Sequence, residues 1–203
     1  MRKIVVGAFV SLDGIMQGPG GPGEDRSGGF ELGGWTVPFF DDLSGAAVGE
    51  LLSPPYDLLL GRKTYDIFAG YWPKAAESGD PLGQQFNAVT KYVASRNQDL
   101  NLAWQNSRQL GADPVAELRQ IKQEDGPRLV TQGSTDFLKT LFQGDLVDEM
   151  TLLIFPVLLG HGKKLFGEGQ MASTFKLMDT KASPSGVVIN RYERAGEVVT
   201  GSF

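Results

Sequence analysis

The sequence predicts an α/β protein with one mostly parallel sheet and an antiparallel C-terminal hairpin. Short apolar runs alternate with segments of helical spacing, at residues 4–10, 56–60, 87–95, 128–131 and 150–159. Strands that alternate with helices indicate a parallel sheet. Two further runs, at 174–181 and 186–193, flank the turn residues Ser183-Pro184-Ser185-Gly186. This pattern is typical of an antiparallel hairpin, which would form the edge of the sheet.

Helix signals separate these runs. A helix is expected from near Pro38 to before residue 53, and a short helix over residues 63–68. Asp113 and Pro114 form a capped helix start, and Gly144 suits a helix end. A glycine-rich segment of 21 residues, 14–34, follows the first strand, and we expect it to be a lid over a binding site.

Composition limits the function. The chain has 203 residues, and we expect one domain over residues 1–203. It has no cysteine and a single histidine, His161, so disulfides, thiol catalysis and cysteine-ligated zinc are excluded and no metal site is expected. The net charge of −5 disfavours nucleic acid and anionic membranes as partners. No apolar stretch approaches the roughly 20 residues of a membrane span, and we expect a cytoplasmic protein.

Three turns that suit phosphate come directly after predicted strands. They are Gly61-Arg62-Lys63-Thr64, Ser95-Arg96 and Gly133-Ser134-Thr135. Ligands of open α/β sheets bind at the carboxyl ends of the strands, where helix N-termini offer free N–H groups to phosphate. Arginines add bidentate donors for a further phosphate. The three turns together predict a site for a dinucleotide that carries an extra phosphate.

Five segments resemble the dihydrofolate reductase superfamily, in the family's order along the chain. They are residues 9–14 (FVSLDG), 60–65 (LGRKTY), 92–96 (YVASR), 132–138 (QGSTDFL) and 146–150 (LVDEM), the last continuing to 156–162 (PVLLGHG) and 165–166. The chain is most similar to bacterial proteins related to the reductase domain of riboflavin biosynthesis. The resemblance implies one dihydrofolate-reductase-like domain that binds NADPH.

The resemblance also implies roles for individual residues. Gly61 to Thr64 would contact the cofactor's phosphates and adenosine side, Ser95 and Arg96 its 2′-phosphate, and Gly133 to Thr135 its pyrophosphate. Asp13 would lie near the nicotinamide and the substrate. Dihydrofolate reductases grip the pterin with one acid on the first helix, but the aligned position here falls near Phe40. Asp41 and Asp42, just beyond it, are therefore the other candidate catalytic carboxylates.

These observations predict an NADPH-dependent reductase that acts on a small heterocyclic, pterin- or pyrimidine-like, or carbonyl substrate. The alternative is a ligand-binding module that keeps the fold without turnover, which the missing acid at Phe40 favours. A homodimer is also expected. Pro156 interrupts the apolar run 150–159, and the residues after it need cover that one domain does not obviously supply.

Overall fold

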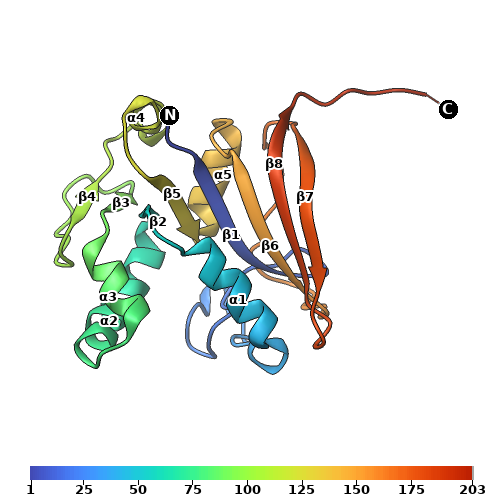
Figure 1. The fold of residues 1–203 in the computed structure, drawn as a ribbon, viewed down its shortest axis with the longest axis horizontal. Helices are drawn as coiled ribbons and strands as arrows, with labels where there is room; N and C mark the ends of the chain where they lie inside the picture. The colour runs from blue at the N-terminus through green and yellow to red at the C-terminus, as the bar shows by residue number, and fades with distance from the viewer. Residues whose placement is uncertain (203) are drawn as a thin grey trace.

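In the computed structural model, which describes residues 1–202, eight strands form one sheet (Figure 1). In chain order the strands are β1 (Ile4–Ser11), β2 (Tyr56–Gly61), β3 (Lys91–Ala94), β4 (Ser107–Gln109), β5 (Arg128–Gln132), β6 (Glu149–Phe155), β7 (Thr174–Ala182) and β8 (Val188–Gly196). Their spatial order is β4-β3-β2-β5-β1-β6-β8-β7. The first six strands pair in parallel, whereas β8 pairs antiparallel with both β6 and β7. The predicted mostly parallel sheet with an antiparallel C-terminal hairpin is confirmed.

Helices cover both faces of the sheet (Figure 1). They are α1 (Asp42–Leu51), α2 (Arg62–Glu77), α3 (Pro81–Ala88), α4 (Pro114–Gln123) and α5 (Thr135–Gln143), with 3-10 turns at Ser27–Gly29 and Val37–Phe39. One apolar cluster joins the sheet to α4 and α5, through residues such as Leu118 and Leu141. A second cluster joins the opposite face to α1, α2 and α3, through Leu51, Tyr65 and Phe86. The sheet is therefore the middle of three layers.

The central strand β1 shows how the sequence specifies these layers. Its side chains alternate between the two faces: Ile4 and Val6 belong to the cluster with α4 and α5, and Val5 belongs to the opposite cluster. Gly7 follows Val6 and faces the end of α1. A Cβ atom there would lie 2.2 Å from Cδ2 of Leu51, so any other residue would force the Leu51 side chain to move.

Three local expectations differ from the structure. The helix expected near Pro38 is a 3-10 turn, and α1 starts after Asp41, whose carboxylate accepts a hydrogen bond from the Ser44 amide. The short helix expected at 63–68 continues to the end of α2 at Glu77. The strand expected at 87–95 begins only at Lys91, because the residues before it complete α3, which Asp80 caps.

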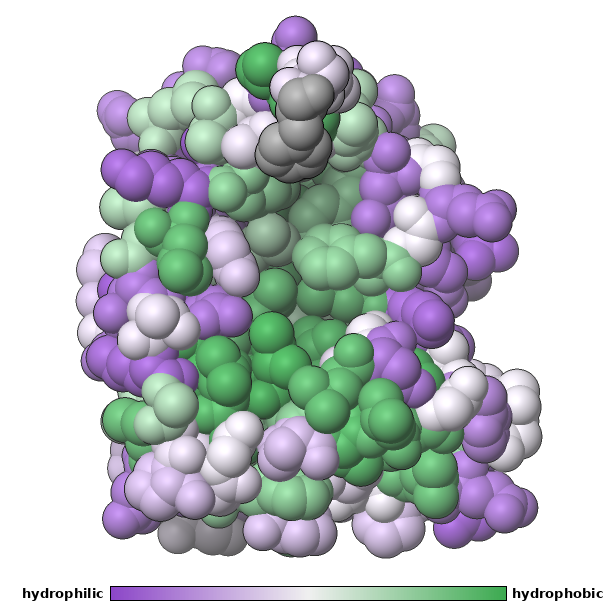
Figure 2. Space-filling view, turned by 90° about the vertical axis from the view of Figure 1, so that its right-hand side faces the viewer, coloured by the Kyte–Doolittle hydropathy of each residue, from purple (hydrophilic) through white to green (hydrophobic). Residues whose placement is uncertain are grey.

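The β7–β8 hairpin forms one side of the molecule, which faces the viewer in Figure 2. Apolar residues gather on this side. Three large exposed ones lie on the hairpin strands, and one lies in the loop after β6: Leu177, Met178, Val188 and Leu158. We call these four residues the hairpin patch.

No helix within residues 1–202 combines the length and the apolar character needed to cross a membrane.

Candidate functional site

A cavity of about 1230 Å³ opens at the carboxyl ends of the parallel strands. Parallel pairing brings these ends to one edge of the sheet; Gly61 at the end of β2, for example, lies in register with Ala94 at the end of β3. The cavity is larger than the roughly 300–1,000 Å³ of most small-molecule pockets. It therefore has room for a dinucleotide together with a second, smaller ligand.

All nine residues that the sequence predicts for cofactor binding line this cavity. They come from three separate turns, each of which follows a strand: Gly61, Arg62, Lys63, Thr64, Ser95, Arg96, Gly133, Ser134 and Thr135. The parallel order of the strands is what brings turns more than 70 residues apart to a common wall. Their binding of a cofactor stays a prediction at this point, but their proximity to one another is now a structural fact.

Two helix N-termini meet on this wall. Gly61 is the N-cap of α2 and Ser134 is the N-cap of α5, and neither helix has a side-chain cap of its own. The two caps are joined by a hydrogen bond of 2.9 Å, which the Gly61 amide donates to Oγ of Ser134. Gly133 and Ser134 both have positive φ angles, of 78° and 64°. The free N–H groups of both first turns suit an anion such as a pyrophosphate.

The arginines of the wall differ in their contacts. Nε of Arg62 donates to Oδ2 of Asp66, one helical turn later, at 2.7 Å, and this hydrogen bond raises the pKa of Arg62. Arg96 is exposed and lines the same cavity. A phosphate that binds near both would compete with Asp66 for Arg62. Arg96 is therefore the more available bidentate donor.

Apolar side chains also line the cavity. The exposed face of α2 contributes aromatic and aliphatic side chains, and β1 and the lid contribute others: Phe9, Met16, Ile67, Phe68, Tyr71 and Trp72. Ile67 and Tyr71 are 37% and 61% exposed, whereas their neighbours Phe68 and Trp72 pack against the second apolar cluster. Flat aromatic surfaces beside a polar phosphate wall suit a planar ring.

The three candidate catalytic carboxylates do not line the cavity. Asp13 accepts hydrogen bonds from Oγ of Ser11 and from the amides of Leu159 and Gly160, and the Ser11 hydroxyl leads in lowering its pKa to about 2. Asp41 caps α1, and Asp42 is an exposed residue in the first turn of that helix. The position of each carboxylate is explained by its place in a turn or at the start of a helix. Their catalytic roles stay predictions without geometric support.

The segment expected to be a lid does cover the cavity, and it brings residues that sequence reasoning missed. Gln17, Glu24 and Asp25 of the lid line the wall, together with Lys163 from the loop after β6. Burial raises the pKa of Glu24. The lid carboxylates sit in a glycine- and proline-rich stretch, and Lys163 is 138 residues away from Asp25. Nothing in the local sequence links these residues, so only the fold could reveal them.

Comparisons with known proteins agree with this architecture. The model of the RibD C-terminal domain family matches residues 2–189. The Bacillus subtilis (strain 168) protein YyaP, itself uncharacterized, is 28% identical over 189 residues, which cover 92% of each chain.

Solved structures show the same fold. A candidate riboflavin biosynthesis protein from Shewanella sp. PV-4 superposes with a TM-score of 0.65 at 20% identity, covering 96% of this chain and 99% of its own. Dihydrofolate reductase from Enterococcus faecalis, complexed with NADP(H), gives a TM-score of 0.57 at 13% identity over 95% and 96% of the two chains. The fold is therefore dihydrofolate-reductase-like, and this chain belongs to the RibD C-terminal domain family.

Proposed function

We propose that this protein is an NADPH-dependent reductase that transfers hydride to a small heterocyclic, pterin- or pyrimidine-like, or carbonyl substrate. One observation carries the proposal: two helix N-termini and two arginines converge on a cavity that aromatic side chains also line. This is the arrangement that a phosphorylated dinucleotide with a flat reactive ring requires.

The residues present fit NADPH. The first turns of α2 and α5 would hold its pyrophosphate, since the Gly61–Ser134 hydrogen bond keeps their N-termini side by side. Arg96, with Arg62, would hold the 2′-phosphate. When bound, the cofactor supplies the hydride. The protein's own residues bind and orient the two rings, and the lid excludes water.

The substrate ring would lie against the apolar wall. Phe9 of β1, Met16 of the lid and Trp72 of α2 are among the side chains that line the cavity. These side chains favour a planar heterocycle over a flexible or highly charged substrate. A solved neighbour supports the same class: the Corynebacterium diphtheriae protein with a TM-score of 0.59 and 13% identity is described as pyrimidine reductase-like.

A second function, ligand binding without turnover, is favoured by one observation. None of the three predicted carboxylates, Asp13, Asp41 and Asp42, lines the cavity. A reductase that protonates its substrate needs a proton source within hydrogen-bond reach, and on the cavity wall this would have to be the lid carboxylate of Glu24, whose pKa burial raises. The discriminating measurement is the absorbance of NADPH during incubation with pterin, pyrimidine and carbonyl compounds. Binding of NADPH with no oxidation by any of them would select the binding module.

The central experiment is titration of the protein with NADPH and NADH, followed by fluorescence. We expect Arg96→Ala to weaken NADPH by about 1–3 kcal/mol, the scale of a hydrogen bond to a charged group, which is about 5- to 150-fold in affinity. NADH should be nearly unaffected, because it lacks the 2′-phosphate. Arg119→Ala is the matched control, since Arg119 is exposed on α4 and does not line the cavity.

Two outcomes would contradict the proposal. If neither cofactor binds below millimolar concentration, the protein is not a nicotinamide-dependent reductase. If Arg96→Ala weakens both cofactors equally, Arg96 does not read the 2′-phosphate.

A further inference from the structure

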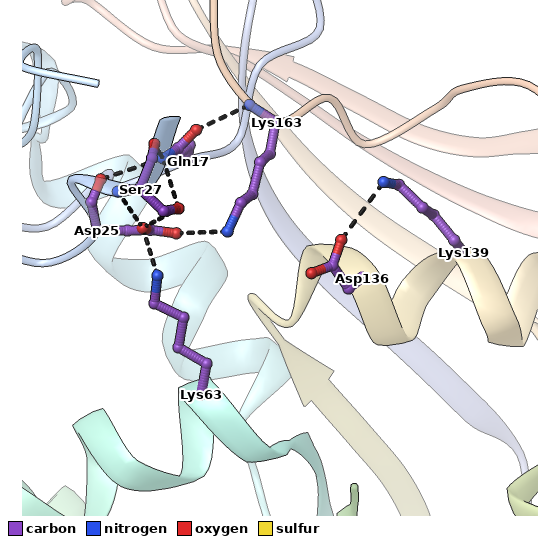
Figure 3. A network of polar contacts seen from close by, with 7 residues as sticks. All are labelled: Gln17, Asp25, Ser27, Lys63, Asp136, Lys139 and Lys163. Carbon is purple, nitrogen blue, oxygen red and sulfur yellow. Dashed lines mark hydrogen bonds and ion pairs between the residues drawn. The ribbon is translucent and has the colours of Figure 1, made fainter. Parts of the chain in front are cut away.

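The lid places a negatively charged side chain, the carboxylate of Asp25, on the cavity wall. The side chain of Asp25 is only 12% exposed. Its Oδ1 accepts a hydrogen bond from Nζ of Lys63, in the first turn of α2, and its Oδ2 accepts one of 2.9 Å from Nζ of Lys163. Figure 3 shows the two lysines approaching the carboxylate from different elements. One carboxylate thus joins three segments that line the site: the lid, α2 and the loop after β6.

The surrounding contacts hold this carboxylate in place and keep it ionised. The amide and hydroxyl of Ser27 also donate to Oδ1 of Asp25. Burial alone would raise the pKa of Asp25, but the hydrogen bonds from Lys63, Ser27 and Lys163 outweigh it and hold the pKa well below its usual range. Asp25 is therefore charged at any physiological pH, so a change in pH does not release it.

Gln17 sets the geometry of this contact (Figure 3). Its side-chain amide donates to the carbonyls of Asp25 and Ser27, and its Oε1 accepts from the amide of Lys163 at 3.0 Å. Gln17 is 3% exposed. The lid and the loop of Lys163 are thus held in register, which keeps Lys163 beside Asp25.

Two lysines aimed at one carboxylate form a site that also suits an external anion. A phosphate or carboxylate group of a ligand presents the same charge and the same kind of acceptor oxygens. Lys63 stands beside Arg62 and Thr64 on the polar wall, so an anion that enters the cavity meets it. The lid carboxylate and an incoming anion therefore compete for the hydrogen bonds of the two lysines.

We propose that Asp25 is an internal competitor: the lid's own carboxylate occupies the Lys63–Lys163 pair, and an anionic group of a ligand must displace it to bind there. Displacement removes the tie between the lid and α2, so binding of the anion and release of the lid from α2 are one event. The apparent affinity for the anion is reduced by the fraction of molecules in which the lysines are free. This autoinhibitory contact does not depend on hydride transfer.

The test uses Asp25→Asn, which keeps the shape of the side chain and removes its charge. Calorimetric titration with inorganic pyrophosphate should show binding about tenfold tighter than in the unmodified protein, as for a lid that is closed in about nine molecules of ten. Adding Lys163→Met to this variant should reverse the gain, because it removes one of the two cations. Glu31→Gln is the matched control: it removes one negative charge from an exposed lid position outside the cavity wall.

Lid release has an independent readout in Arg26, the exposed residue next to Asp25. Trypsin cleavage after Arg26, followed by mass spectrometry of the fragment 1–26, should be faster in Asp25→Asn and unchanged in Glu31→Gln. Pyrophosphate should speed this cleavage in the unmodified protein and have little effect on Asp25→Asn. Because neither readout uses NADPH, the result is independent of whether the protein is a reductase.

The source of the anion is resolved by repeating the titration with the protein saturated with NADPH. Under these conditions the difference between Asp25→Asn and the unmodified protein is compared: its loss would assign the lysine pair to a phosphate of the cofactor, and its persistence would assign the pair to the second ligand. The inference is overturned if Asp25→Asn binds pyrophosphate no more tightly than the unmodified protein. It is also overturned if pyrophosphate protects Arg26, because the lid would then close over the anion instead of yielding to it.

Discussion

Ser134 links the two helix N-termini of the site, and its replacement tests whether that link stabilises the fold. Its Oγ accepts the hydrogen bond from the Gly61 amide at 2.9 Å, and its backbone is in the left-handed region, with φ of 64° and ψ of 45°. Replacement by alanine removes the acceptor and keeps a Cβ atom in this unfavourable conformation. Replacement by glycine removes the acceptor but also the Cβ atom.

The two replacements should therefore differ in stability. Loss of the acceptor leaves the Gly61 amide unsatisfied, which costs about 1–3 kcal/mol where the group is kept from water. Glycine adopts the left-handed region freely, whereas other residues lose roughly 1–2 kcal/mol there. We expect Ser134→Ala to lower the free energy of unfolding by about 1–3 kcal/mol. Ser134→Gly should be more stable than Ser134→Ala by about 1 kcal/mol, since glycine's greater freedom in the unfolded chain offsets part of the gain.

Urea denaturation measures these differences. Ser78 provides a matched control of opposite sign, because it follows α2 with φ of −81°, where a Cβ atom causes no strain. There the glycine variant should be less stable than the alanine variant. If Ser134→Gly is no more stable than Ser134→Ala, the left-handed conformation does not strain residue 134 and the argument fails.

Two further predictions follow from the structure. The Ser11 hydroxyl, followed by the Gly160 and Leu159 amides, lowers the pKa of Asp13 to about 2, so its ionised form stabilises the fold fully above pH 3.8, its ordinary pKa, and this contribution is lost as pH falls through about 2. Asp13→Asn should flatten that part of the stability profile, measured by urea denaturation between pH 2 and 6; an unchanged profile would remove Asp13 as its cause. We also propose a homodimer through the hairpin patch. Light scattering should give about twice the chain mass of 21.9 kDa, and Leu158→Lys should shift it towards the monomer; a mass near 21.9 kDa for the unmodified protein would refute the dimer.

Local patterns in the sequence were sufficient for the strands and for the polar wall of the site. Apolar runs with turn residues after them are properties of neighbouring residues, and they correctly located β1, β2 and β5; β6 was located too, but it ends at Phe155 and not at residue 159. The parallel arrangement then follows from the intervening helices. This is why nine residues from three turns could be assigned to one cavity before the structure was known. The short strand β4 was missed, because three residues carry too little periodicity to stand out.

Tertiary structure alone decided what Asp13 and Asp25 do, whereas the cap that Asp41 provides for α1 is a local contact. Asp13, Asp41 and Asp25 look alike in the sequence, as acids beside glycine-rich or apolar segments. The fold turns Asp13 towards the amides of residues 159 and 160, gives Asp41 to the cap of α1, and places Asp25 between Lys63 and Lys163. These partners, apart from the cap of α1, lie between 38 and 147 residues away along the chain. A side chain's role depends on the groups that surround it, and the sequence brings such distant groups together only once the sheet has formed.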